Sequence, residues 1–314
     1  MSVLPFFSIA PRLRLRRFVP FVALFVFFPL TAPADTLRLK SGESVAGKIE
    51  GLDGDRVVLA LQLDSGNATA PYPLALIDRA TLDASPAEAA LLNRLPQPAD
   101  LAAWRAFWER RSPLLRLPGS DGGTVGLALA QLLLENDPAQ AGTIAAAIAS
   151  GDWNGVRREE ARALAAAALL AQGKEPEAEA AAQALLANVA DPAARVDARF
   201  VLGRIAAARW TAFAAAHPHW QGVPAQAAAQ NALADRALDA FLAAPVFLPG
   251  DPLRAGRGLF AAASAAADTD RAREAAALLD DLLESFPASP QAAEAQALRQ
   301  RLAAAGLIPT ASSS

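Results

Sequence analysis

Few side chains in this sequence have types and spacing that could do chemistry. His217 and His219 are the only two histidines, and two imidazoles at this spacing could bind one metal ion. A zinc site needs three or four ligands, and no third ligand follows at a recognisable spacing. We therefore expect no metal site, and instead a turn at Pro218 that ends a helix.

Paired carboxylates are the other candidates for chemistry. Glu159–Glu160 and Asp280–Asp281 could suggest general acid–base catalysis. Neighbouring residues on a helix point about 100° apart, so the two carboxylates of a pair do not face one substrate. The chain also has no cysteine, no glycine-rich phosphate loop and no nucleophile elbow. The sequence predicts a protein that is not an enzyme, with no catalytic residue and no cofactor.

The first 34 residues have the order of a secretory signal peptide. Four arginines without an acid precede an apolar run from Phe18 to Leu30, and Ala32-Pro33-Ala34 follows. The run is about 13 residues long, whereas a helix that crosses a bilayer needs roughly 20. We expect residues 1–34 to be cleaved after Ala34 and the protein to be periplasmic or otherwise exported. The alternative is an uncleaved membrane anchor.

The charge balance argues against a polyanionic partner. Without residues 1–34 the chain has 25 basic and 32 acidic residues, a net charge of −7. The arginines are scattered among the acids, and no basic stripe of the kind that binds nucleic acid is present. We expect no nucleic-acid partner.

Residues 35–82 predict a small β module, because glycines punctuate short alternating runs there. Asp53–Gly54 between Ile49 and Val57 predicts a hairpin turn, since glycine tolerates a positive φ. Five short strands in fewer than 50 residues indicate a small antiparallel barrel. The expected strands are residues 36–39, 44–52, 56–63, 68–72 and 76–81.

This segment has a pattern of apolar residues and glycines with a known parallel. The pattern reads Leu37-x-Leu39-x-x-Gly42, Gly47-x-Ile49, Val57-x-Leu59 and Pro73-Leu74-x-x-Ile77. It resembles the SH3-like or Sm-like small β barrels found near the start of exported bacterial proteins. The resemblance implies a module that packs on the helices or spaces them from the envelope, and small barrels serve many roles.

Everything after residue 83 is expected to be helical. The 80 alanines among 314 residues are typical of closely packed helices. Serine or aspartate followed by proline marks a helix start, because the side chain caps free N–H groups and proline has none to lose. Residues 83–159 are predicted to form helical hairpins. The five predicted starts are Ser85–Pro86, Asp137–Pro138, Asp191–Pro192, Asp251–Pro252 and Ser289–Pro290.

Residues 160–305 repeat at a period of about 34 residues. The best unit is 256–289, in which Ala275, Leu279, Leu282 and Pro287 have the spacing of a second helix. The segment resembles tetratricopeptide repeats, with a second unit at 160–189. Roughly 22 extra residues around 210–230 interrupt the pattern, and residues 306–314 are expected to be a disordered tail.

The resemblance implies a superhelix whose first helices line a groove for a protein or peptide. In this family, ligand-facing positions follow fixed offsets from a Leu-Gly pair in the first helix, here Leu202–Gly203. The alternative for Phe200 and Phe260 is a place in the core between helices. The partner-binding positions that the resemblance assigns are Asp197, Phe200, Arg204, Arg257, Phe260 and Ser264.

The sequence thus predicts an exported, noncatalytic scaffold or adaptor that is mainly helical. One alternative is a homo-oligomeric structural element of the cell envelope, assembled through Trp104 and Trp108 or through the barrel. Another is an accessory subunit of a cell-wall enzyme.

Overall fold

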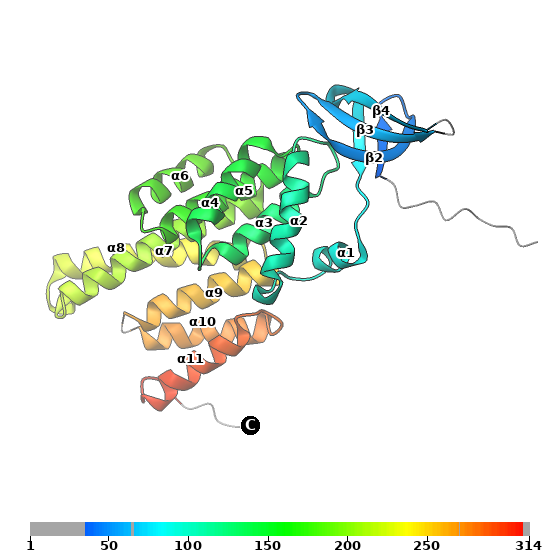
Figure 1. The fold of residues 1–314 in the computed structure, drawn as a ribbon. Coiled ribbons are helices and arrows are strands. Elements are labelled where there is room, and N and C mark those ends of the chain that lie inside the picture. Colours follow the sequence, from blue (N-terminus) through cyan, green and yellow to red (C-terminus); the bar gives the residue numbers. More distant parts are fainter. Residues whose placement is uncertain (1–34, 64–65, 270, 310–314) are drawn as a thin grey trace, which may run out of the picture. The chain divides into compact units, whose positions relative to one another are not determined.

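The computed structural model describes residues 35–63, 66–269 and 271–309, and the chain there is mainly helical with a β-sheet at its start (Figure 1). The predicted signal peptide, residues 1–34, lies outside the described residues. None of the described helices is long and apolar enough to cross a membrane.

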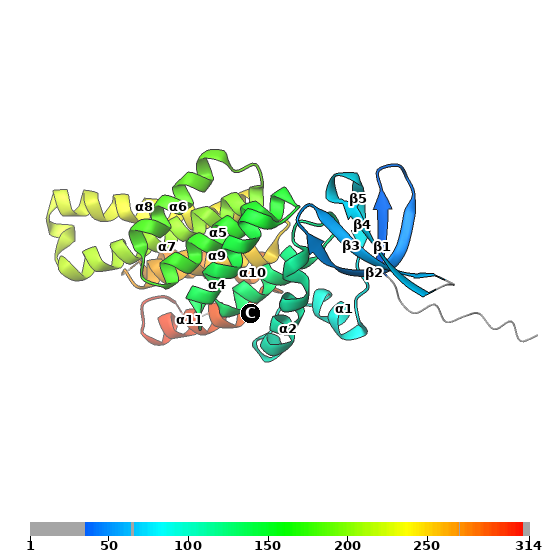
Figure 2. The same cartoon turned by 45° about the horizontal axis from the view of Figure 1, so that its top comes forward.

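The five predicted strands are confirmed. They form one antiparallel sheet in the order β4-β3-β2-β1-β5, and Figure 2 shows all five. The loop of the β2–β3 hairpin is Gly54–Asp55, where Gly54 has the positive φ of +57°. The side chains of Leu37, Val57 and Leu59 are fully buried in the core of the sheet. The strands are β1 (Asp35–Leu39), β2 (Ser44–Asp53), β3 (Arg56–Leu63), β4 (Gly66–Pro73) and β5 (Ile77–Thr81).

The sheet does not close into the barrel that the sequence predicted. Among the described strands, β4 and β5 are the two edges. Pro71 and Pro73 have no N–H to donate, so β4 suits an edge position. The β5 edge is covered by a loop, since the N–H of Ala80 donates to the carbonyl of Pro118 at 2.6 Å. Gly119, with φ +91°, allows this contact because a Cβ there would overlap the Ala80 backbone.

Eleven α-helices follow in the described part of the chain. Four of the five predicted helix starts are confirmed, and Ser85 forms a capping box with Glu88. The fifth is wrong by two residues, because Ser289 is buried against Gly256 and the helix begins after Gln291. The helices are α1 (Pro86–Leu92), α2 (Leu101–Arg111), α3 (Gly122–Leu133), α4 (Pro138–Gly151), α5 (Gly155–Ala171), α6 (Glu175–Asn188), α7 (Pro192–Ala216), α8 (Pro224–Phe247), α9 (Pro252–Ala267), α10 (Ala272–Ser285) and α11 (Ala292–Ala304).

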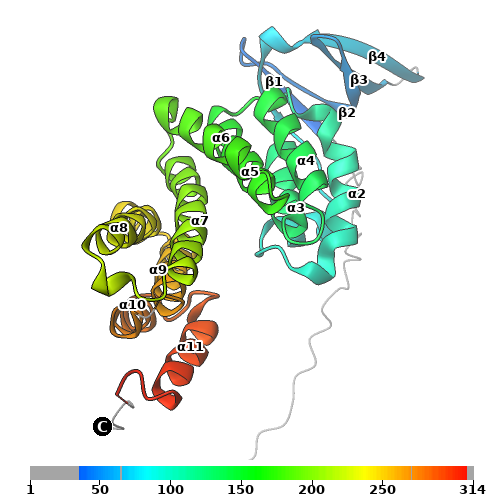
Figure 3. The same cartoon turned by 90° about the vertical axis from the view of Figure 1, so that its left-hand side faces the viewer.

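From α2 to α11, each helix packs against the next one along the chain. The helices of α3/α4, α5/α6, α7/α8 and α9/α10 contact each other, and the first helices of neighbouring pairs also touch. Helix α7 packs against α5, α6, α8 and α9, and Figure 3 shows it among these neighbours. Ile308, within the predicted tail, is buried in the core of the last pairs.

The extra residues around 210–230 lengthen one helix pair. Helices α7 and α8 have 25 and 24 residues, whereas α9 and α10 have 16 and 14. The turn between α7 and α8 begins at His217, so Pro218 follows the end of a helix as predicted.

Trp104 is not available for an interface between copies of the chain. Its side chain is 2 % exposed and stacks on Phe107 in the core formed by α2, α3 and α4. The neighbouring Trp108 is half-buried and lies against Gly126. The idea of assembly through Trp104 is therefore wrong.

Helices α7, α8 and α9 come together around Phe241. A Cβ at Gly203 of α7 would lie 2.8 Å from the Phe241 ring, and one at Gly258 of α9 would lie 2.5 Å from the Phe241 carbonyl oxygen. Real side-chain carbons do not approach this closely, so both positions require glycine at this helix spacing. The two glycines set how closely α8 packs between α7 and α9.

Gly203→Ala tests this packing. The added methyl group should overlap the Phe241 ring and lower the free energy of unfolding by about 1–3 kcal/mol through overpacking. Gly142→Ala is the matched control, because Gly142 also lies inside a helix and a Cβ there would have ordinary contacts at 3.5 Å. Helix propensity should make the control neutral or more stable by up to about 1 kcal/mol. Equal effects in urea unfolding would contradict the close approach.

Candidate functional site

The positions predicted to face a partner lie on α7 and α9, and an ion-pair cluster joins several of them. Asp197 of α7 accepts hydrogen bonds from Arg254 of α9 at 3.0 and 3.1 Å, and its other carboxylate oxygen pairs with Arg257. One carboxylate thus holds two guanidinium groups from the neighbouring first helix. Charge-assisted pairs of this kind, partly shielded from water, fix the geometry of both helices.

Arg254 is the centre of this cluster. It also bonds Asp251 at 2.7 Å, and its guanidinium lies 3.6 Å from Glu160 of α5. Burial works against the charge on Arg254, but the carboxylates of Asp197 and Asp251 outweigh it and raise its pKa. The cluster therefore links α5, α7 and α9 through one permanently charged side chain. Sequence reasoning missed Arg254 because its partner Asp197 is distant along the chain.

Glu160 is the member of the cluster whose negative charge the surroundings disfavour. Burial raises the pKa of its carboxyl group, and although Arg254 acts in the opposite direction, Asp191 and Asp197 add to the rise. Asp251 behaves differently: burial raises its pKa, but hydrogen bonds from Arg254 outweigh this and the net shift is downward. Glu160 thus carries its negative charge at a cost, whereas Asp251 is stabilised as a carboxylate.

Phe200 lies between this cluster and the core. The Arg257 guanidinium lies 4.3 Å from the centre of its ring, and the Phe241 ring is 5.3 Å away on the core side. Phe200 is half-buried, so it serves largely as packing between helices. Arg204 is exposed, and Phe260 and Ser264 of α9 are half-buried. The structure therefore brings Asp197, Phe200 and Arg257 into contact and leaves Arg204 exposed.

His217 and His219 lie just after the end of α7, and the His217 ring contacts Phe213 in the last turn of that helix. The Nδ1 atom of His217 lies 3.0 Å from the carbonyl oxygen of Phe213, and the rings of His217 and Phe213 stack with their centres 4.3 Å apart. Among the described side chains, no group of three possible ligands gathers closely enough to hold a metal ion.

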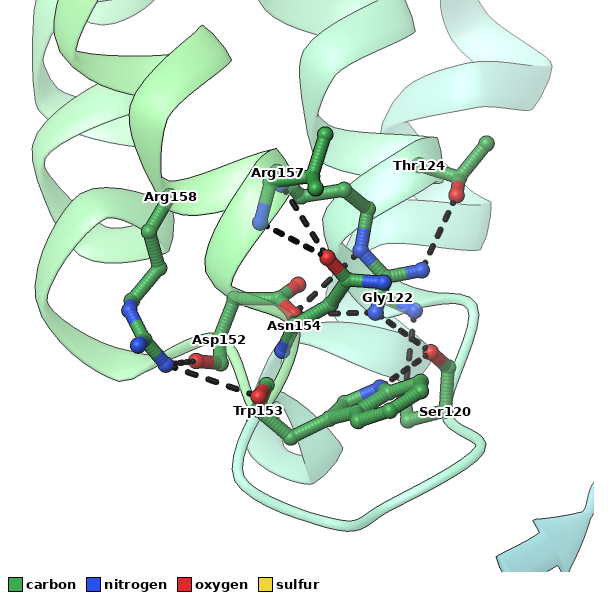
Figure 4. Close-up of polar contacts among 9 residues, drawn as sticks. Ser120, Gly122, Thr124, Asp152, Trp153, Asn154, Arg157 and Arg158 are labelled. Carbon is green, nitrogen blue, oxygen red and sulfur yellow. Dashed lines mark hydrogen bonds and ion pairs between the residues drawn. The ribbon is translucent and has the colours of Figure 1, made fainter. Parts of the chain in front are cut away.

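The most buried ion pair lies elsewhere, at the turn between α4 and α5 (Figure 4). The Asp152 side chain has no exposed surface and pairs with Arg157 at 2.9 Å. Arg157 and the Trp153 indole N–H both donate to the Ser120 carbonyl, at 3.0 and 2.9 Å. Gly123 makes room for the Asp152 carboxylate, because a Cβ there would overlap it. These contacts hold the loop before α3 against the α4–α5 turn.

Comparisons with known proteins do not assign the chain to a family. No protein-family model matches it, and neither a curated protein nor a solved structure matches it significantly. The case for a function therefore rests on the residues and their geometry.

Glu160→Gln tests the raised pKa of Glu160. Because the folded state holds this proton more tightly than the unfolded state, the wild type should lose stability as pH rises above about 4.3, the ordinary glutamate value. The amide has no charge to desolvate, so the variant should gain stability relative to the wild type between pH 4 and pH 7. Unfolding in urea at several pH values measures this. The exposed Glu109→Gln is the control, and a difference that is independent of pH would contradict the shift.

Arg157→Met tests the buried pair. The substitution leaves the Asp152 carboxylate buried without its counter-charge, which should lower the free energy of unfolding by about 3–5 kcal/mol. The double variant Arg157→Met/Asp152→Asn removes that charge and should recover part of the loss. Arg105→Met, at an exposed arginine of α2, should have little effect. Equal losses in the single and double variants, measured by urea unfolding, would argue against a charge effect.

Proposed function

We propose that this protein is a noncatalytic scaffold or adaptor that binds a protein or peptide partner on the face shared by α5, α7 and α9. The observation that carries the proposal is the stacking of successive helix pairs, in which the second helix of one pair packs on the first helix of the next and the first helices also touch. Such packing leaves one face of the first helices uncovered by their second helices. Arg204 of α7 is exposed and Phe260 of α9 is half-buried at the edge of the core, and these residue types commonly anchor interfaces.

The helix pairs support a tetratricopeptide-like superhelix as the finer description of the fold. In this proposal α3/α4, α5/α6, α7/α8 and α9/α10 are the repeats, and α11, which packs on α9 and α10, caps the last one. The expected signal peptide would place this scaffold outside the cytoplasm. The β-sheet would then be an accessory module that is fixed to the helices through the Ala80–Pro118 contact.

The six predicted positions fall into two groups with different tasks. Asp197 and Arg257 pair with each other, and Phe200 is enclosed by Arg257 and Phe241, so these three hold the helices in place. Arg204, Phe260 and Ser264 have no ion pair or hydrogen bond through their side chains among the described residues. We infer that the partner contacts this second group.

The double variant Arg204→Ser/Phe260→Ala tests this face. Affinity capture from an envelope extract, with quantitative mass spectrometry, should recover a partner with the wild type and at least ten-fold less of it with the variant. The matched control is Arg273→Ser/Phe286→Ala on and beside α10, because Phe286 packs against the same core as Phe260 and Arg273 is also exposed. Equal recovery with the wild type and the double variant would contradict the assignment, provided circular dichroism shows both folded. Light scattering of the mature chain separates a monomeric adaptor from a homo-oligomer.

A further inference from the structure

The face of α7 that points away from Asp197 is hollowed. One hollow of about 320 Å³ lies beside the start of α7 and the end of α8, and a second of about 480 Å³ lies between α6 and α8. Arg199 lines both, so the two hollows adjoin each other along α7, and together they are here called the α7 groove. Its α7 residues are Arg195, Val196, Arg199, Leu202, Ile205, Ala206 and Arg209.

The α7 groove is separate from the face of the proposed function. Positions 195, 199, 202, 206 and 209 are spaced three or four apart and therefore share one side of the helix. Asp197, Phe200 and Arg204 lie on the other side, with the same spacing. A substitution in the groove can therefore be made without touching Arg204 or Phe260.

Unpaired positive charge marks the groove. Arg195, Arg199 and Arg236 form no ion pair with any described carboxylate, whereas Arg209 is held by Glu175 and Glu179. Arg195 donates one hydrogen bond, to the Val189 carbonyl at 2.8 Å. Two acids also line the groove, the exposed Asp239 of α8 and Glu179 of α6, so four arginines face two carboxylates. The local surplus of guanidinium groups stands out in a chain whose net charge is −3.

Arg199 is the best-prepared of these cations. Its guanidinium lies 5.3 Å from the centre of the Phe247 ring, and it has no hydrogen-bond partner among the described residues. Stacking on an aromatic ring orients the planar group while all of its N–H donors stay available. An arginine that is already oriented loses less freedom when it binds a carboxylate through two parallel hydrogen bonds.

The groove also offers apolar surface. Phe247 is 58 % exposed and the neighbouring Val246 is 67 % exposed, although both are large hydrophobic residues. Val196 and Ile205 are buried beneath the groove and give it an apolar floor. The α7 positions from 195 to 209 extend over about 21 Å at 1.5 Å per residue. That length suits about six residues of extended peptide at 3.3 Å per residue.

We propose that the α7 groove binds an acidic peptide segment of a partner protein. One apolar side chain of the segment lies against Phe247 in the smaller hollow, and an adjacent carboxylate pairs with Arg199 and Arg195. A second carboxylate pairs with Arg236 at the other end of the groove. Charge complementarity and the apolar floor together favour a segment in which acids alternate with aromatic or aliphatic residues. This surface is additional to the one in the proposed function.

Selection of a random phage-displayed 12-residue peptide library on the full chain tests the proposal. The enriched peptides should carry glutamate or aspartate next to phenylalanine, tryptophan or leucine. Fluorescence anisotropy then measures the affinity of the most enriched peptide for each variant. Arg199→Glu should weaken binding at least ten-fold because it replaces attraction with repulsion, and Phe247→Ser should weaken it several-fold because it removes the exposed ring.

Matched variants separate this site from the proposed function. Arg204→Ser/Phe260→Ala should bind the peptide as the wild type does, and Arg273→Ser is the control for a lost surface arginine. Enrichment without acidic residues, or peptide binding that Arg199→Glu and Phe247→Ser both leave unchanged, would overturn the proposal. Displacement of the peptide by single-stranded DNA or by phosphatidylglycerol vesicles would also overturn it, because the groove would then bind polyanions generally. These results are independent of partner recovery on the opposite face.

Discussion

The close approach of α7, α8 and α9 at Phe241 is the constraint on which the rest of the helical structure depends. Gly203 and Gly258 have no side chain, and this allows the Phe241 ring and backbone to lie directly against both neighbouring helices. At this spacing Asp197 reaches Arg254 and Arg257. The two glycines allow the close helix spacing, and the ion-pair cluster of Asp197, Arg254 and Arg257 stabilises it.

This arrangement gives the two sides of α7 different roles. On one side, Asp197 pairs with Arg254 and Arg257, Arg257 covers an aromatic ring, and Arg204 stays exposed. On the other side, Arg195 and Arg199 have no carboxylate partner among the described residues, and Phe247 is largely exposed. A helix whose two sides differ in this way can be held firmly in the fold and still offer a surface to a partner. The buried Asp152–Arg157 pair has a comparable structural role between α4 and α5.

The sequence was sufficient for features that depend on nearby residues. Strand positions follow from alternating apolar residues, and the caps at Ser85, Asp137, Asp191 and Asp251 follow from contacts within three residues. The open sheet was not predictable, because its β5 edge is covered by the contact of Ala80 with Pro118, which is distant along the chain. The start of α11 was misplaced for a similar reason, since Ser289 is buried against Gly256.

In the candidate sites too, the sequence indicated positions along a helix but not the contacts between residues distant along the chain. The resemblance selected six positions on α7 and α9, of which Asp197, Phe200 and Arg257 are in contact, but it could not show that Asp197 already pairs with Arg254 and Arg257. The repeat pattern also gave no reason to single out Arg199, because its significance depends on which carboxylates lie near it in space. Only the two hollows and the surrounding ion pairs identify the α7 groove.

Hydrogen–deuterium exchange of the full chain, resolved along the sequence by mass spectrometry, tests most directly whether the contact at Phe241 joins three helices into one unit. If it does, the amides around Gly203, Phe241 and Gly258 should exchange slowest and with one shared opening free energy, because none can open without the others. The amides near the turn at His217 should exchange much faster. Separate opening free energies for the three segments, or protection no higher than at that turn, would contradict the account.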